Sequence, residues 1–128
     1  MSKARLMLAG AIAAPLLAAC ANGVSADYIQ AKEPRRIHSP ASTSDLVLCL
    51  KARLDQDASI VAYPEPGKVD VRVGYAESAD YRYFYLISLR RAQAGTNVEI
   101  RSAGEWRPLM SENRVAGWVE DCKPGTAH

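Results

Sequence analysis

The chain has little of what enzymes use for catalysis. It contains only two histidines, His38 and His128, and neither falls within a predicted helix or strand. A Ser-His-Asp or Cys-His site needs a histidine held on a rigid element, and no His, Cys and Asp spacing here resembles a zinc site. No glycine-rich loop stands between a strand and a helix, as a phosphate-binding loop requires. We therefore expect no enzymatic activity, no metal and no cofactor.

Excess positive charge is also missing from most of the chain. The 16 basic and 14 acidic residues give a formal net charge of +2. Two of the basic residues, Lys3 and Arg5, lie in the first few positions, where there is no acidic residue. The charges of the remaining chain therefore balance. Because nucleic-acid binding needs a net basic face, we expect no nucleic-acid partner.

One long apolar segment is present, and it lies at the N-terminus. It follows Lys3 and Arg5, covers residues 6–17 and is interrupted only by Gly10 and Pro15. This segment is too short for a membrane-spanning helix. A basic start, an apolar stretch and small residues after it are typical of a secretory signal. The pattern predicts a signal peptide over residues 1–19.

The end of this segment, Leu17-Ala18-Ala19-Cys20, resembles the lipobox of bacterial lipoproteins. In that family a signal peptidase cuts before the cysteine after its thiol has been diacylated. The resemblance implies lipidation of Cys20 and stable anchoring, because two or more acyl chains hold a protein at a membrane. Ala21 stands where an Asp retains enterobacterial lipoproteins in the inner membrane, which implies the outer membrane, facing the periplasm. The alternative is an ordinary signal peptide with Cys20 unmodified.

Two further cysteines, Cys49 and Cys122, remain after Cys20 is assigned to the lipid. The compartment that the signal implies is oxidising, so a disulfide between them is expected. The alternative is a pair of free thiols that await a redox partner. Both cysteines fall on the apolar faces of predicted helices, which favours a structural bond.

The chain beyond Cys20 divides into a linker and one domain. Residues 20–41 show no sustained periodicity, so we expect a flexible tether. Residues 42–125 form the predicted domain, and residues 126–128 a tail. Helix-capping residues precede a helix at about 44–55, and four alternating segments predict an antiparallel meander at 59–63, 69–75, 81–90 and 97–101. Apolar residues at helical spacing predict a last helix, namely Val115, Trp118, Val119 and Cys122.

The predicted fold is α+β. It is a two-layer arrangement of helix, four-stranded antiparallel meander and helix, with both helices on one face of the sheet. The other face is expected to be free of helices.

The predicted strand at 81–90 is partly apolar on both faces. In one interpretation it is a central strand, and Phe84 and Leu86 are shielded by the long side chains of Arg72 and Arg101. In the other, Phe84 and Leu86 form an exposed patch that arginines surround and that binds a partner. The candidate interaction residues are Arg72, Arg82, Phe84, Leu86, Arg90, Arg101 and, in a predicted turn, Trp106.

The layout resembles that of small lipoproteins of Gram-negative bacteria, which combine a lipobox, a short tether and a compact α+β domain with one disulfide. This resemblance brings no site residues. We expect a non-enzymatic interaction or envelope-assembly module whose partners are the membrane, through its lipid, and a periplasmic protein or the cell wall. The alternative is an inhibitor or sensor of a cell-wall hydrolase or of a cell-wall fragment, which would act through an exposed loop at 64–68 or 102–107.

Overall fold

A computed structural model describes residues 23–104 and 110–125 of the chain. The predicted signal peptide, Cys20, Trp106 and the tail at 126–128 lie outside these ranges. Within them, no helix combines the length and the apolar character needed to cross a membrane.

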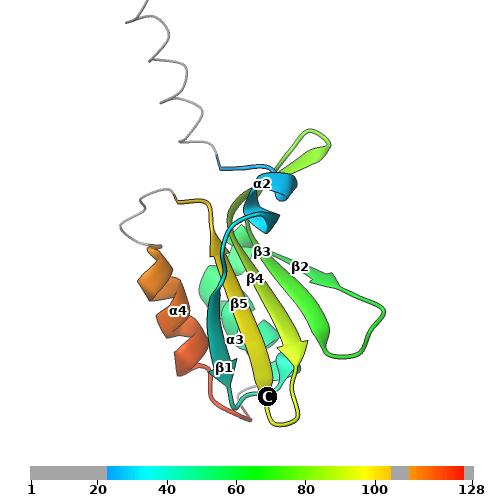
Figure 1. Cartoon of the computed structure of the whole chain (residues 1–128), viewed down its shortest axis with the longest axis vertical. Coiled ribbons are helices and arrows are strands. Elements are labelled where there is room, and N and C mark those ends of the chain that lie inside the picture. The colour runs from blue at the N-terminus through cyan, green and yellow to red at the C-terminus, as the bar shows by residue number, and fades with distance from the viewer. Residues whose placement is uncertain (1–22, 105–109, 126–128) are drawn as a thin grey trace, which may run out of the picture.

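Five antiparallel strands form one open sheet (Figure 1). Their order across the sheet is β1-β5-β4-β3-β2. The bounds are β1 (Arg35–Ser39), β2 (Ala58–Ala62), β3 (Lys68–Glu77), β4 (Asp80–Arg91) and β5 (Thr96–Ser102). The predicted α+β class is confirmed. The prediction of four strands is wrong, because β1 adds a fifth at the edge beside β5.

Helices accompany the sheet along the described chain, and each α-helix begins at a serine. The side-chain oxygens of Ser25, Ser42 and Ser111 accept a hydrogen bond from the backbone N–H three residues further on, which is the usual N-cap interaction. The bounds are α2 (Ala26–Gln30), α3 (Thr43–Leu54), the 3-10 helix η1 (Asp55–Asp57) and α4 (Glu112–Asp121). The two helices that the sequence predicts correspond to α3 and α4.

The segment predicted as a flexible tether, residues 20–41, contains both α2 and β1. Strand β1 pairs with β5, and Ile37 lies opposite Val98. Further upstream, Val24 forms an isolated bridge with Tyr83 of β4. The tether prediction is therefore wrong from Val24 onward. Strand β1 contains one large apolar residue and offers no alternating pattern, so its strand conformation comes from pairing with β5 and not from local sequence.

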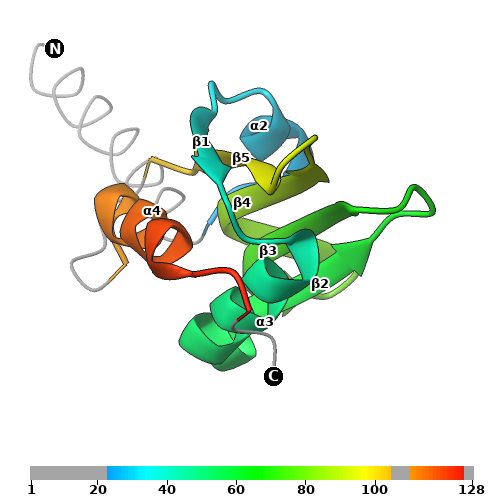
Figure 2. The same cartoon turned by 90° about the horizontal axis from the view of Figure 1, so that it is seen from below.

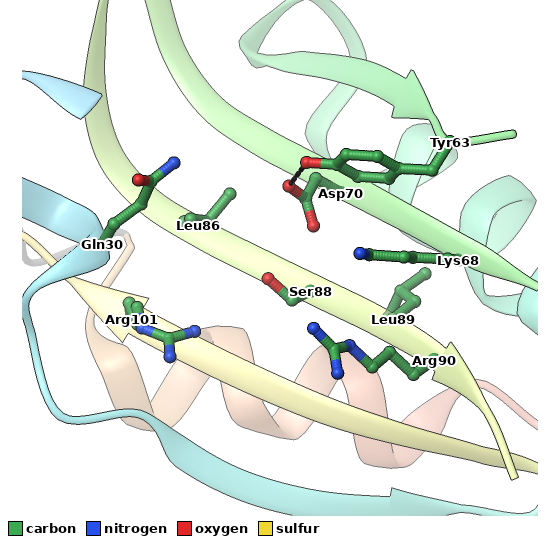
Figure 3. Close-up of a pocket in the computed structure, with 9 residues that line it drawn as sticks. All are labelled: Gln30, Tyr63, Lys68, Asp70, Leu86, Ser88, Leu89, Arg90 and Arg101. Atoms are coloured by element: carbon green, nitrogen blue, oxygen red, sulfur yellow. Dashed lines mark hydrogen bonds between the residues drawn. The ribbon is translucent and has the colours of Figure 1, made fainter. Parts of the chain in front are cut away.

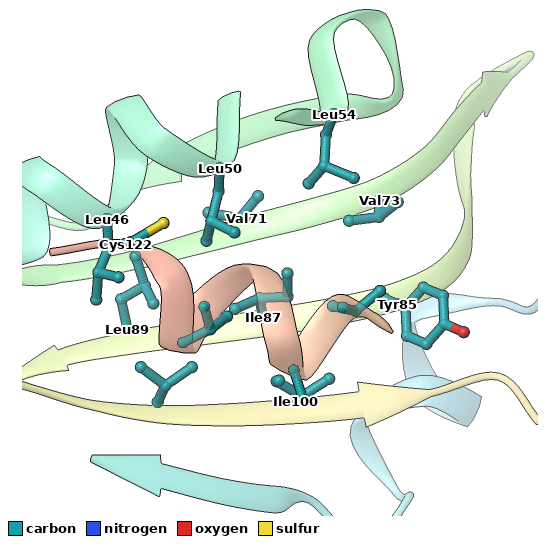
Figure 4. Packing of buried hydrophobic residues seen from close by; sticks show 14 of the residues in the cluster. Leu46, Leu50, Leu54, Val71, Val73, Tyr85, Ile87, Leu89, Ile100 and Cys122 are labelled. Carbon is teal, nitrogen blue, oxygen red and sulfur yellow. The ribbon is translucent and has the colours of Figure 1, made fainter. Parts of the chain in front are cut away.

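The main hydrophobic core lies between the sheet and the two long helices (Figure 4). It joins apolar side chains of α3 and α4 to the inward side chains of the three central strands, including Leu46, Leu50, Leu54, Val115, Val119, Val71, Val73, Tyr85, Ile87, Leu89, Val98 and Ile100. Cys49 in α3 and Cys122 after α4 form a disulfide with an Sγ–Sγ distance of 2.00 Å. The predicted pairing of these two cysteines is confirmed, and it joins the two helices of this layer.

Strand β4 contains one more residue than β3 where the two strands pair. Val73 lies opposite Tyr85, and the next pair is Gly74 with Tyr83, so Phe84 has no opposite residue. An extra residue of this kind forms a β-bulge and shifts the alternation of side chains along the strand. The tyrosines at 83 and 85 therefore belong to different faces of the sheet, although their spacing in the sequence predicts one face.

A second, smaller hydrophobic cluster lies on the face opposite α3 and α4. Ile29 of α2 packs there with Tyr83 and Leu86 of β4 and with Ala103. Figure 2 shows α2 on the opposite side of the sheet from α3 and α4. The expectation of a helix-free face is therefore wrong at this end of the sheet, which α2 covers.

Candidate ligand-binding site

Beyond α2, the face of the sheet opposite α3 and α4 is polar. Because side chains alternate along a strand, the residues between those of the main core point to this face, which we call the open face. The strand register arranges them in three cross-strand rows over β3, β4 and β5. The first row is Lys68, Arg90 and Asn97; the middle row is Asp70, Ser88 and Glu99; and the third row is Arg72, Leu86 and Arg101. An acidic row is thus flanked by two basic rows.

A hollow of about 230 Å³ lies on the open face, between α2 and the segment that joins β2 to β3 (Figure 3). It takes residues from all three rows and from both flanking segments. The residues that line it are Gln30, Tyr63, Lys68, Asp70, Leu86, Ser88, Leu89, Arg90 and Arg101. We call it the open-face hollow.

On one side of the hollow, Arg101 is held by a hydrogen bond and an ion pair before any ligand arrives. Its Nε donates to the backbone oxygen of Lys32 at 3.1 Å. Its Nη1 lies 3.7 Å from a carboxylate oxygen of Glu99. Glu99 in turn accepts from Nε of Arg36 at 3.1 Å. Since its side chain is only 20% exposed, Arg101 presents a guanidinium that is already oriented.

Across the hollow, Tyr63 and Asp70 form a second fixed pair. The hydroxyl of Tyr63 donates to Oδ2 of Asp70 at 2.5 Å. This hydrogen bond to a carboxylate is the main reason that the pKa of Tyr63 lies above its ordinary value. Nζ of Lys68 lies 4.7 Å from the centre of the Tyr63 ring. The ring, the carboxylate and the ammonium thus form one wall of the hollow.

The first row brings two positive charges together. Lys68 and Arg90 lie directly opposite each other on β3 and β4, an arrangement that is unfavourable for like charges. Arg90 is exposed, and its guanidinium has no hydrogen-bond or ion-pair partner within residues 23–104 and 110–125. Besides its position over the ring of Tyr63, Nζ of Lys68 makes a long contact of 3.8 Å to Glu65, whose side chain is 76% exposed. The positive charge of this pair is therefore weakly compensated by the protein itself.

Of the residues that the sequence singled out, the structure brings four to this region. Leu86, Arg90 and Arg101 line the hollow, and Arg72 lies beside them in the third row. The guanidinium of Arg72 stacks on the ring of Tyr81 at 4.2 Å from its centre. Its Nε atom is buried, and no described residue accepts a hydrogen bond from it.

Phe84 and Arg82 do not join this region, and the exposed patch of Phe84 and Leu86 is not formed. Phe84, at the bulge, packs against the main core, whereas Leu86 is 4% exposed in the cluster with Ile29. Arg82 donates to the backbone oxygen of Gly23 at 2.9 Å. The physical reasons are the bulge, which moves Phe84 to the other face, and α2, which covers Leu86 in place of the arginine side chains.

Several residues of the hollow were not singled out from the sequence. They are Gln30, Tyr63, Asp70, Ser88 and Leu89, and Lys68 was named only as the end of the candidate loop at 64–68. The polar set of β3 is visible as an alternating pattern, but the pairing of β3 with β4 that sets Lys68 opposite Arg90 is a long-range property. Gln30 belongs to a segment in which no helix was expected.

The described residues contain no cluster of three or more His, Cys, Asp or Glu side chains suited to a metal ion. Comparison with protein-family models, with curated proteins and with solved structures gave no match. What this protein does is therefore inferred from its own residues.

Proposed function

We propose that this chain is a non-enzymatic binding module of the cell envelope, anchored by lipid on Cys20, that engages a partner through the open face. In this proposal α3 and α4 form the supporting layer of a two-layer body, and the sheet is the binding layer. The anchor and its outer-membrane, periplasm-facing location rest on the lipobox resemblance of Leu17-Ala18-Ala19-Cys20.

The observation that carries the proposal is the weakly compensated pair of Lys68 and Arg90 at a preformed hollow. Two positive side chains directly opposite each other lower stability, and features that break a local rule of stability concentrate at functional sites. Arg101 and Asp70, which are already fixed by hydrogen bonds, add oriented charges at low entropic cost. An oppositely charged partner would relieve the repulsion and meet a largely preorganised surface.

The short stretch between Cys20 and the first paired residue limits how far the module reaches. Val24, which pairs with β4, stands four positions after Cys20. A stretch of four residues spans at most about 14 Å. If lipid is attached to Cys20, the domain is therefore held close to the membrane surface, and its partner must be found there.

A second candidate function is a sensor of cell-wall fragments or an inhibitor of a cell-wall hydrolase. The observation in its favour is Tyr63, a 38% exposed ring at the rim of the hollow and next to the loop at 64–68. An aromatic ring beside a carboxylate suits a ligand with an apolar face and polar groups. Inhibition assays of purified protein against a panel of muralytic enzymes test this alternative.

The main proposal is tested by chemical crosslinking in intact cells, followed by affinity purification and mass spectrometry. We expect a partner that is recovered with the wild type and lost with Arg90→Glu. The matched control is Arg91→Glu, since Arg91 is also exposed and is adjacent but belongs to the other alternating set of β4. Recovery of the same partners with Arg90→Glu would contradict the proposal.

A further inference from the structure

The charges of the open-face hollow alternate in a way that restricts what it binds. This inference rests on the proposed binding function and specifies its ligand. The first row presents Lys68 and Arg90, and the middle row presents Asp70 and Glu99. Neighbouring rows are two residues apart along a strand, which corresponds to about 7 Å. A complementary ligand has a negative group and a positive group separated by a similar distance.

The negative group of the ligand belongs at the first row. Arg90 has all its guanidinium donors uncommitted among the described residues, and Lys68 adds a second cation directly opposite. Ser88, the next outward-facing residue on β4, supplies a hydroxyl at the wall of the hollow. Arginine matches the two oxygens of a carboxylate with paired hydrogen bonds. A carboxylate is therefore well matched to this end of the hollow.

The positive group of the ligand belongs at Asp70. Its Oδ2 accepts from Tyr63, whereas none of the described residues donates to its Oδ1 atom. Glu99 is less suited to the role, because it is already bound by Arg36 and Arg101. Asp70, the carboxylate among the residues that line the hollow, disfavours a second negative group of the ligand beside it, since like charges at this range repel. It favours an ammonium there.

The size of the hollow limits the ligand further. A volume of about 230 Å³ is smaller than the roughly 300–1,000 Å³ of sites for drug-sized molecules. Two peptide residues span about 7 Å when extended, which equals the separation of the first and middle rows. The ring of Tyr63 offers apolar surface beside the two charged ends, and Leu86 lines the hollow beyond Asp70, in the third row.

We propose that the open-face hollow binds a short peptide with a free carboxylate and a free ammonium about two residues apart. The carboxylate binds between Arg90 and Lys68, and the ammonium binds Oδ1 of Asp70. Such peptides come from two sources, since proteins supply L-residues and bacterial cell walls also contain D-residues. The chemistry of recognition at the two charged ends is shared.

The test is isothermal titration of the full chain in detergent with defined probes. These are L-Ala-L-Ala, D-Ala-D-Ala, the C-terminal amide and the N-acetyl form of whichever dipeptide binds more tightly, and inorganic phosphate. We expect at least one dipeptide to bind. Its amide and N-acetyl forms should bind more weakly by about tenfold or more, as the loss of a charge-assisted hydrogen bond predicts. The stronger of the two stereoisomers identifies the source.

Variants locate the site. Arg90→Gln should weaken dipeptide binding by about tenfold or more, whereas Arg91→Gln should leave it unchanged. Asp70→Asn should remove the preference for the free ammonium over the N-acetyl form. Both Arg90 and Arg91 are exposed, so neither variant is expected to unfold the protein, and circular dichroism checks this.

Four outcomes overturn the inference: neither dipeptide binds, the amide binds as well as the free acid, phosphate binds more tightly than both dipeptides, or Arg90→Gln binds like the wild type. The proposed function fails separately. If dipeptides do not bind but an envelope partner is still lost with Arg90→Glu, the peptide inference is wrong and the interaction module stands. If dipeptides bind as expected but no envelope partner depends on Arg90, the peptide inference stands and the proposed partner function is wrong.

Discussion

Replacing both Cys49 and Cys122 with alanine should lower the free energy of unfolding by about 4 kcal/mol. The two residues are 73 positions apart, and a crosslink of this length removes loop-closure entropy from the unfolded chain worth about 4 kcal/mol at 25 °C. Small domains have a total stability of about 5–15 kcal/mol. The bond is therefore expected to supply a large part of the stability of this protein.

Alanine is the appropriate replacement because Cys122 is 1% exposed, and a buried serine hydroxyl would add its own unfavourable term. The assay is equilibrium urea unfolding followed by far-UV circular dichroism. With a slope of about 2 kcal/mol per molar urea, typical of small proteins, the midpoint should fall by about 2 M. Reduced wild type is the matched control and should unfold like the double variant, because it loses the same bond with both sulfur atoms retained.

A loss below about 1 kcal/mol would refute the loop-closure reasoning for this bond. It would mean that residual contacts between the α3 and α4 segments and the strand segments keep the two ends of the domain together in the unfolded ensemble, or that the bond strains the native state. A wild type that shows two free thiols by alkylation and intact mass would refute the pairing itself.

Three further predictions concern the bulge, the tyrosines and α2. Gly74→Ala should destabilise the fold by about 1–3 kcal/mol, because a Cβ there would lie 1.9 Å from a backbone oxygen of β4. The control, Gly117→Ala, has open space around its Cβ and should be neutral or stabilising by up to about 1 kcal/mol. Thermal unfolding compares the two variants. Two tyrosines have a pKa above the ordinary value of about 10. The pKa of Tyr63 is raised chiefly by its hydrogen bond to Asp70, and that of Tyr81 chiefly by burial. Their contribution to stability is therefore complete below pH 10 and is lost as pH rises through the raised values. Absorbance titration at alkaline pH should show two tyrosines ionising late, and late ionisation of none would contradict the hydrogen bond of Tyr63 and the burial of Tyr81. Ile29→Ala, at a residue that is 0% exposed, should lower stability by about 2–5 kcal/mol and increase hydrogen exchange in α2, whereas unchanged exchange there would show that α2 does not depend on this contact.

The parts of the fold that were predictable from sequence are those with a strong local signal. Helix α3 has a serine cap and apolar residues at helical spacing, Leu46, Leu50 and Leu54, that all reach the core. Strand β3 alternates between buried Val71 and Val73 and polar neighbours. In both cases the period of the apolar residues matches the geometry of one element, and tertiary contacts agree with it.

The parts that were not predictable depend on contacts distant in sequence. Strand β1 is held by β5, which lies about 60 residues away, through pairs such as Ile37 with Val98. The bulge at Phe84 arises from pairing with β3 around Gly74, and the sequence of β4 alone does not predict it. Alternation alone therefore predicts one face for the apolar side chains at 84 and 86, although the bulge separates them.

The candidate site was predictable in its charges but not in its arrangement. Arg90 and Arg101 stood out as cations near a strand with two apolar faces, and both line the hollow. Their acidic counterpart, Asp70, and the opposing cation, Lys68, depend on the register of the β3–β4 hairpin. That register places a polar grid where an apolar patch had been one of the two interpretations.

The measurement that tests the central claim most directly is site-specific photo-crosslinking in living cells from the two faces of the domain. A photoreactive amino acid is placed at Ser88, in the middle row of the open face, or at Leu48, which is 50% exposed on α3. The account predicts a discrete crosslinked adduct from position 88, competed by the dipeptide probe that binds, and none from position 48. Adducts from position 48 alone would contradict it.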